Sequence, residues 1–127
     1  MGLERSPEGC RPTVLLIEGD DGLRGLYRQA LGLPGYHVKE ARGGFEALRF
    51  LDTHSPDVVV LDLMLPGLDG FTVLAELAAQ ERTRHIPVVV VTGSTEELQS
   101  LGVSRVLRKP VFSDQLLEAV RASAARH

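Results

Sequence analysis

The sequence lacks the features on which secreted and membrane-spanning proteins depend. Its single cysteine, Cys10, cannot form an internal disulfide, and this composition is typical of the reducing cytoplasm. The longest apolar runs are four to six residues, too short to cross a bilayer, and the N-terminus has no apolar core of the secretory kind. We therefore predict a cytoplasmic protein with no membrane partner.

The sequence also has no excess of basic residues and no zinc-binding pattern. The 14 Lys and Arg residues are outnumbered by 17 Asp and Glu, and the net charge of -3 argues against direct contact with nucleic acid. The four histidines are scattered along the chain without the spacing of zinc ligands. They are His37, His54, His85 and His127.

Short apolar runs alternate with helical patterns along a single domain. Strands are expected at 13–17, 36–41, 58–61, 86–91 and 103–107, each followed by apolar residues at helical spacing. Residues 1–11 show no periodicity and are expected to form a disordered leader to a domain at 12–127. The pattern predicts an α/β fold of the flavodoxin-like (βα)5 type, a doubly wound parallel sheet with strand order 2-1-3-4-5.

The first two helical patterns indicate how those helices begin and which side they bury. Asp20 or Asp21 is expected to cap the first helix, which carries Leu26 among its inward residues. The second helix follows two glycines and is expected to bury Phe45.

The remaining helices are predicted from glycine and capping signals. The third runs from residue 70 to about residue 82. Ser94 and Glu97 form a capping box for a short fourth helix, and Ser113 is expected to cap the last helix.

Polar side chains follow four of the expected strands at the point where each strand ends. Glu18 and Asp62 follow the first and third strands, and Thr92 and Lys109 follow the fourth and fifth. Each taken alone has an ordinary explanation as a capping or solvated loop residue. The carboxyl ends of parallel strands share one edge, where ligands bind in open α/β sheets, so the four together indicate a site.

Oxygen ligands at this edge suit a magnesium ion. Mg²⁺ is held in proteins by one or two carboxylates, a carbonyl and water molecules. We expect Glu18 and Asp62 to supply the carboxylates and the Met64 backbone to supply the carbonyl. Asp20 is a further candidate ligand.

The same residues match the needs of phosphoryl transfer. A divalent cation and an ammonium group neutralise the charge of a phosphoryl group while the attacking oxygen is held in line. Asp62 is the expected nucleophile and would form an acyl phosphate. Thr92 is expected to donate a hydrogen bond to the phosphoryl group, and Lys109 to pair with the carboxylate or the phosphate.

Several segments together match a known family over about residues 13–124. They are the acidic turn after the first strand, Arg24 in the first helix, the segment 62–70, Thr92-Gly93 and Lys109-Pro110. With these segments the chain resembles the receiver domain of bacterial response regulators, such as the chemotaxis regulators of two-component signalling.

The resemblance implies a phosphorelay function. Asp62 would accept a phosphoryl group from the phosphohistidine of a histidine kinase or phosphotransfer protein, with Mg²⁺. Thr92 would then move toward the phosphate and reshape a face recognised by a downstream protein of unknown identity. The chain would be a phosphoacceptor that assists its own phosphoryl transfer and hydrolysis, and not an enzyme.

The chain departs from the receiver pattern at three points. Receivers usually carry two adjacent acids after the first strand, and here Gly19 replaces the second, which predicts weakened Mg²⁺ binding. Val106 stands where an aromatic residue usually accompanies the threonine. Only 17 positions separate Thr92 from Lys109, a spacing that predicts a shortened helix 4.

Other functions are compatible with parts of this pattern. A degenerate receiver, acting as a phosphorylation-independent interaction module, is favoured by Gly19 and Val106. The intact Asp62, Thr92 and Lys109 oppose it. A haloacid-dehalogenase-like phosphatase would need a second acid at the position of Met64. A flavin or nucleotide site would need a phosphate-cradling loop where this chain has an acidic turn.

Overall fold

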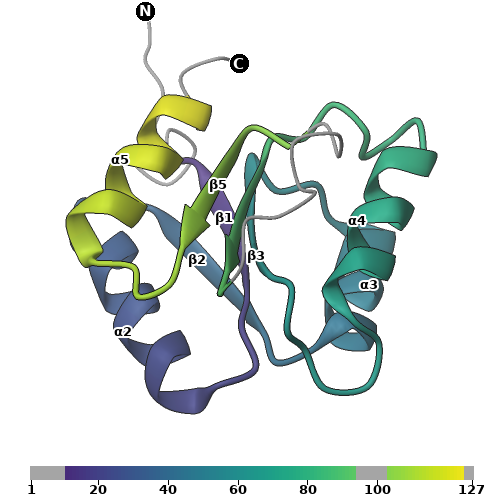
Figure 1. Ribbon diagram of the computed structural model, residues 1–127. Coiled ribbons are helices and arrows are strands. Elements are labelled where there is room, and N and C mark those ends of the chain that lie inside the picture. The colour runs from purple at the N-terminus through teal and green to yellow at the C-terminus, as the bar shows by residue number, and fades with distance from the viewer. Residues whose placement is uncertain (1–10, 94–102, 125–127) are drawn as a thin grey trace, which may run out of the picture.

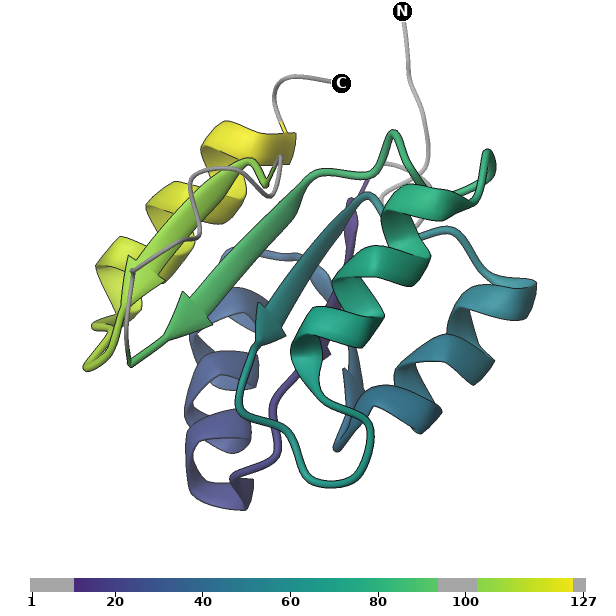
Figure 2. The same ribbon diagram turned by 45° about the vertical axis from the view of Figure 1, so that its right-hand side comes forward.

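The computed structural model describes residues 11–93 and 103–124 and shows a parallel sheet between two layers of helices (Figures 1 and 2). Its five strands lie in the order β2-β1-β3-β4-β5, which confirms the predicted order. The strands are β1 (Thr13–Ile17), β2 (His37–Ala41), β3 (Val58–Asp62), β4 (Val88–Thr92) and β5 (Arg105–Arg108). The helices are α2 (Asp21–Gly32), α3 (Gly44–Thr53), α4 (Gly70–Ala79) and α5 (Ser113–Ala124).

The three central strands are apolar on both sides because helices cover both faces of the sheet. One core lies between the sheet and the α2 and α5 helices, and it contains Tyr27, Leu31 and Leu116. The other lies under α3 and α4, and it contains Leu51 and Leu77. Figure 2 shows the two pairs of helices on opposite sides of the strands. None of the described helices is long and apolar enough to cross a membrane.

Two helices begin at aspartates that follow strand ends. The Asp20 side chain accepts a hydrogen bond of 2.7 Å from the Leu23 N–H, as expected for the cap of α2. Asp69 caps α4 in the same way, through a bond of 2.9 Å from the Thr72 N–H. Both caps direct a helix back along the sheet from its carboxyl edge.

The helical spacing predicted two buried side chains wrongly. Leu26 is 48% exposed and Phe45 is 65% exposed. In α3 the small residues Gly44 and Ala47 face the core instead, because the helix packs closely against the loop after β3. A Cβ atom on Gly44 would lie 2.7 Å from the Leu68 carbonyl oxygen, so this side of the helix has no room for a large side chain.

Several element boundaries also differ from the prediction. The α4 helix ends at Ala79 and not near residue 82, because the Thr83 hydroxyl donates to the Leu77 carbonyl and turns the chain. The α5 helix begins at Ser113, and the Phe112 N–H before it donates to the Gln115 side chain, so Ser113 is not the cap. The fourth and fifth strands begin two residues later than predicted and end one residue later.

Two of the predicted segments cannot be compared with the structure. The capping box of Ser94 and Glu97, and with it the shortened helix 4, lies outside the described residues. The expected leader lies outside them as well, apart from Arg11.

The start of α4 offers a test of how tightly the site-bearing strand is packed. A Cβ atom on Gly70 would lie 2.5 Å from the Leu63 Cα, whereas a Cβ on Gly32 would meet no heavy atom within 4 Å. We expect Gly70→Ala to lower the free energy of unfolding by about 2 kcal/mol through overpacking. The matched change Gly32→Ala is expected to raise it by about 0.5 kcal/mol through helix propensity. Urea unfolding measures both, and equal stabilities of the two variants would contradict the packing argument.

Candidate functional site

The ends of four strands bring the predicted site residues to one edge of the sheet. Asp62 and Thr92 are the last residues of β3 and β4, and Glu18 and Lys109 directly follow β1 and β5. Their backbones extend the strand pairing: the Glu18 N–H donates to the Ala41 carbonyl at 3.1 Å and the Lys109 N–H to the Thr92 carbonyl at 2.7 Å. The edge is therefore held by main-chain bonds as well as by the core.

Asp62 lies at the centre of the site and is only 3% exposed. Its Oδ2 atom is 3.2 Å from the Lys109 Nζ, and its Oδ1 accepts a bond of 3.0 Å from the Met64 N–H. The same ammonium lies 3.8 Å from the Glu18 Oε1. A single ammonium group, that of Lys109, thus faces two buried carboxylates.

Glu18 is the less satisfied of the two acids. It is 2% exposed; its Oε2 accepts from the Asp20 N–H at 3.1 Å, while its Oε1 has no hydrogen-bond partner among the described residues. Burial raises the pKa of Glu18 to about 7, and the neighbouring Asp62 adds to the rise, against the opposing effects of the Asp20 N–H and Lys109. Near neutral pH this carboxyl group therefore retains a proton for part of the time.

Thr92 is buried at the same edge, with 5% of its surface exposed. Strand alternation places its side chain on the face that α3 and α4 cover, whereas Asp62 belongs to the opposite face. The two residues thus approach the edge from the two sides of the sheet.

The oxygen donors at this edge fit a hard divalent cation, although only two carboxylates are available. The Glu18 Oε1, which accepts no hydrogen bond from the described residues, and the Asp62 carboxylate are oxygen donors at one edge. Asp20 is engaged as the cap of α2, and no group of three His, Cys, Asp or Glu side chains that could hold a metal occurs among residues 11–93 and 103–124. A cation here would therefore depend on two carboxylates, with carbonyl or water oxygens completing its shell.

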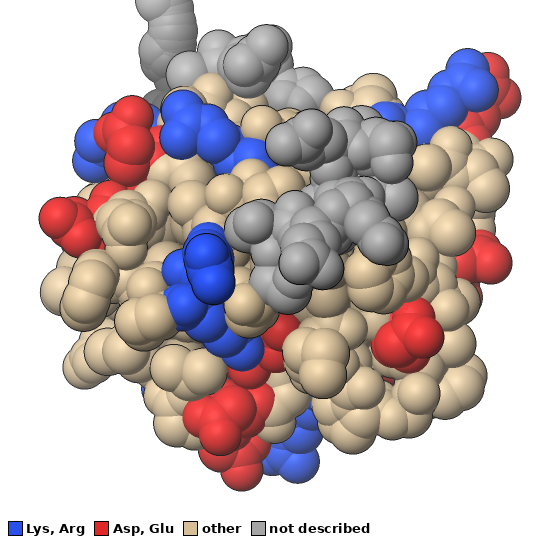
Figure 3. Space-filling model, in the orientation of Figure 1, with Lys and Arg blue, Asp and Glu red and all other residues tan. Residues whose placement is uncertain are grey.

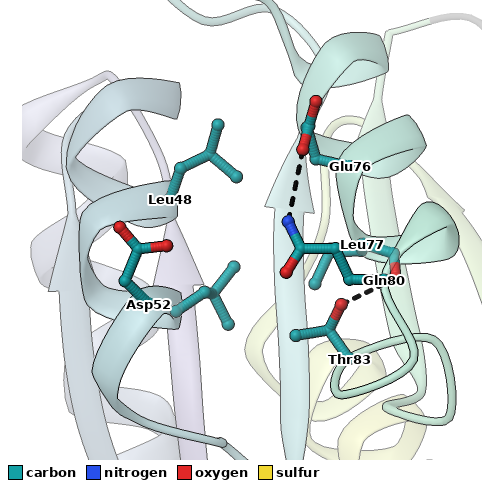
Figure 4. Close-up of a pocket in the computed structure, with 7 residues that line it drawn as sticks. Leu48, Asp52, Glu76, Leu77, Gln80 and Thr83 are labelled. Carbon is teal, nitrogen blue, oxygen red and sulfur yellow. Dashed lines mark hydrogen bonds between the residues drawn. The ribbon is translucent and has the colours of Figure 1, made fainter.

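A separate cavity of about 250 Å³ lies between α3 and α4 (Figure 4). It is lined by residues of the C-terminal halves of these helices and by Gln80 and Thr83 beyond α4, and it therefore lies toward the amino edge of the sheet. Two of its polar side chains are bonded within the lining: the Gln80 amide donates to Glu76, and the Thr83 hydroxyl donates to the Leu77 carbonyl. The cavity takes no part in the site around Asp62.

The family description that this chain matches is the response regulator receiver domain, over residues 14–121. The chain belongs to this family. The sequence resemblance and the predicted fold are thereby confirmed.

Individual relatives share the receiver domain and differ in length. The transcriptional regulatory protein AfsQ1 of Streptomyces coelicolor is 33% identical over 120 residues, which are 91% of this chain and 52% of AfsQ1. The polar-differentiation response regulator DivK of Brucella ovis is 30% identical over 115 residues, 87% of this chain and 94% of DivK. This chain thus spans about half the length of AfsQ1 and nearly all of DivK.

A solved receiver structure has the same fold. The receiver domain of the Francisella response regulator 1452 superposes with a TM-score of 0.83 at 30% identity, and the match covers 91% of this chain and 98% of that one. Receiver domains generally bind Mg²⁺ at their phosphorylation site and interact with histidine kinases or phosphotransfer proteins.

Within this receiver domain, Gly19 occupies a position that is sterically closed. A Cβ atom there would lie 2.9 Å from the Pro66 Cδ and 3.5 Å from the Arg42 carbonyl oxygen. The Pro66 ring belongs to the loop after β3, which is the loop that also carries Met64. An acid at position 19 would therefore require this loop to shift, a constraint that the sequence did not indicate.

The surroundings of this receiver site carry charges of both signs. In Figure 3, basic side chains gather along β5 and end beside acidic ones at the carboxyl edge of the sheet. Arg105 and Arg108 are the exposed basic residues of β5 itself. Val106, between them, is partly buried and packs on the core beneath α3 and α4.

The raised pKa of Glu18 predicts how stability depends on pH in the metal-free protein. The folded state favours the protonated carboxyl, so the stabilising contribution is fully present below the ordinary value of 4.5 and is lost as pH rises through about 7. At about 1.4 kcal/mol per pKa unit, the loss is on the order of 3 kcal/mol. Glu18→Gln should remove it.

Urea unfolding of wild type and Glu18→Gln between pH 5 and 8, with a chelator present, measures this effect. We expect the stability of wild type relative to the variant to fall across this range. Glu81→Gln, a change at a fully exposed acid, serves as the control and should leave the pH profile unchanged. A constant difference between wild type and Glu18→Gln at all pH values would contradict the assignment.

Proposed function

We propose that this receiver domain accepts a phosphoryl group on Asp62 from the phosphohistidine of a histidine kinase or phosphotransfer protein, with Mg²⁺, in the cytoplasm. The observation that carries the proposal is the position of the Asp62 carboxylate, buried at the strand ends between the Lys109 ammonium and the Met64 N–H. The chain would act as a phosphoacceptor that assists its own phosphorylation and hydrolysis.

The local geometry supports Asp62 as the nucleophile. The Met64 N–H holds one carboxylate oxygen and Lys109 faces the other, which fixes the orientation of the carboxylate before a donor arrives. Attack of an Asp62 oxygen on phosphorus forms the P–O bond of an acyl phosphate, while the P–N bond to the donor imidazole breaks and its electron pair stays on the nitrogen. Lys109 then lies where it can pair with the transferred group.

The cation contributes charge and this chain contributes its ligands. Mg²⁺, when bound, supplies positive charge that offsets the negative charge of the phosphoryl oxygens. Glu18 and Asp62 would hold it, with the Met64 carbonyl as a third donor. Because burial raises the pKa of Glu18 to about 7, the carboxyl is partly protonated near neutral pH, and binding of the cation would displace the proton where it is present.

Exposed apolar side chains around the site support a protein as the phosphoryl donor. Met64 is 76% exposed, and Phe45 and Phe112 are each 65% exposed. They follow β3, β2 and β5 respectively, so all three lie at the carboxyl edge that carries Asp62. Exposed apolar groups of this kind mark protein interaction surfaces. A small phosphodonor would not need contacts with them.

The output of the switch would follow from Thr92. A phosphoryl group on Asp62 would add charge and three acceptor oxygens at the edge where β4 also ends, and we expect the Thr92 hydroxyl to move toward it and donate a hydrogen bond. Movement of Thr92 would alter the adjoining surface and its recognition by a downstream protein. Val106 has no aromatic ring to follow this movement, so the surface change in this chain would not involve a ring at that position.

Phosphorylation by a small-molecule donor tests the proposal directly. Incubation with acetyl phosphate and Mg²⁺ should add one phosphoryl group to the intact mass of the wild-type chain, and Asp62→Asn should remain unmodified. Asp52→Asn, which alters an exposed acid on α3, should be modified like wild type. Absence of any adduct, together with no binding of beryllofluoride, would favour the phosphorylation-independent interaction module.

Protein and small-molecule donors should respond differently to the apolar residues at the carboxyl edge. We expect Phe112→Ser to slow transfer from a phosphorylated phosphotransfer protein about tenfold, which corresponds to about 1.4 kcal/mol of lost contact. Its phosphorylation by acetyl phosphate should not change. The control Leu33→Ser removes an apolar side chain that is 84% exposed, more than Phe112, at the far end of α2, and it should slow neither reaction. An equal loss with both donors would count against a docking role.

A further inference from the structure

Arg24 is the one buried basic side chain among the described residues, with 8% of its surface exposed. It lies in the first turns of α2, beside the turn that leaves β1. Its three guanidinium nitrogens all have partners, and these partners lie on three different segments. A buried arginine with every nitrogen engaged indicates a role that depends on geometry.

One of these contacts reaches the main chain of the phosphorylation site. The Arg24 Nη1 donates a buried hydrogen bond of 3.0 Å to the carbonyl oxygen of Glu18. The Nη2 bonds the Asp21 carboxylate at 2.6 Å and the Nε bonds the Glu40 carboxylate on β2 at 3.2 Å. The guanidinium therefore ties the end of β1 to α2 and to the neighbouring strand.

The turn that Arg24 contacts is also held by the Glu18 N–H bond to the Ala41 carbonyl and by the Asp20 cap of α2. Between these two points the side chains of the turn add little. Gly19 contributes no side chain, and the Glu18 carboxylate is oriented by a single hydrogen bond from the Asp20 N–H. The direction in which Glu18 Oε1 faces Lys109 therefore depends on the position of this short stretch of backbone. A fixed Glu18 carbonyl restrains that stretch.

We propose that Arg24 is a positioning residue for the phosphorylation site, acting through the Glu18 carbonyl to hold the turn that directs the Glu18 carboxylate toward Asp62 and Lys109. The inference rests on the proposed function, and it adds a residue that touches neither phosphoryl group nor cation. Lysine could not replace it, because a single ammonium on a flexible stem cannot hold the same three partners in a planar fork.

Arg28 offers a matched control within the same helix. It also pairs with Glu40, at 3.2 Å, but it is 54% exposed and forms no contact with Glu18 among the described residues. Arg24→Lys and Arg28→Lys therefore make the same chemical change on the same partner carboxylate. Arg24→Lys also removes the Asp21 bond within α2 and alters a buried site, and it alone removes the bond to the Glu18 carbonyl that restrains the turn after β1.

Amide hydrogen exchange and Mg²⁺ titration test the proposal at a temperature where every variant is folded. We expect Arg24→Lys to speed exchange of the Asp20 amide, and to weaken Mg²⁺ binding and acetyl phosphate uptake about tenfold, as for one lost charged hydrogen bond. Exchange in β3 should be unchanged. Arg28→Lys should match wild type in all three measurements.

The possible results separate the two proposals. The positioning role is overturned if Arg24→Lys folds and keeps wild-type exchange and Mg²⁺ affinity. It is also overturned if exchange speeds up without loss of Mg²⁺ affinity or phosphoryl uptake, or if Arg28→Lys shows equal losses. If wild type itself takes up no phosphoryl group, the proposed function fails, and the Asp20 exchange still decides whether Arg24 holds the turn. Should Arg24→Lys fail to fold, Glu40→Gln loosens the guanidinium while keeping its bond to Glu18, and smaller changes in the same direction are expected.

Discussion

The site depends on one ammonium group facing two carboxylates that are buried at the end of the sheet. Burial of a charge is unfavourable unless it is paired, and Lys109 cannot fully compensate both Asp62 and Glu18. The excess negative charge is met in the isolated chain by partial protonation of Glu18. A bound cation or a change of charge on Asp62 alters the balance of charge among Lys109, Asp62 and Glu18. A modification of Asp62 is therefore coupled to the protonation and contacts of its neighbours.

This arrangement is maintained by close backbone packing as much as by charge. The start of α4 lies so near the end of β3 that only glycine fits at position 70, and the start of α3 lies equally near Leu68. The Pro66 ring closes the space beside Gly19. The loops around Asp62 are therefore packed against each other. The glycine at position 19, where receivers usually have a second acid, fits the close approach of the loop after β3.

The fold was predictable because strand and helix periods differ and both are clear in this sequence. The strand segments, their order and the four residues at their carboxyl ends agree with the structure. Apart from shifted element boundaries and the cap of α5, the errors concern which helical residues face the core: Phe45 and Leu26 have the spacing of buried residues but are exposed. Hydrophobic spacing identifies an apolar side of a helix, and it cannot identify positions where close packing admits only Gly44 or Ala47.

The residue pattern alone predicts the alternation of strands and helices and, through it, the gathering of Glu18, Asp62, Thr92 and Lys109 at one edge. This follows because parallel strands joined by helical crossovers end on the same side. The folded chain was needed to choose Asp20 over Asp21 as the cap of α2, to show that Glu18 is buried with one oxygen lacking a hydrogen bond from the described residues, and to show that Arg24 joins three segments. Burial and hydrogen bonding depend on distances between segments far apart in the chain, and such distances leave no local pattern in a sequence.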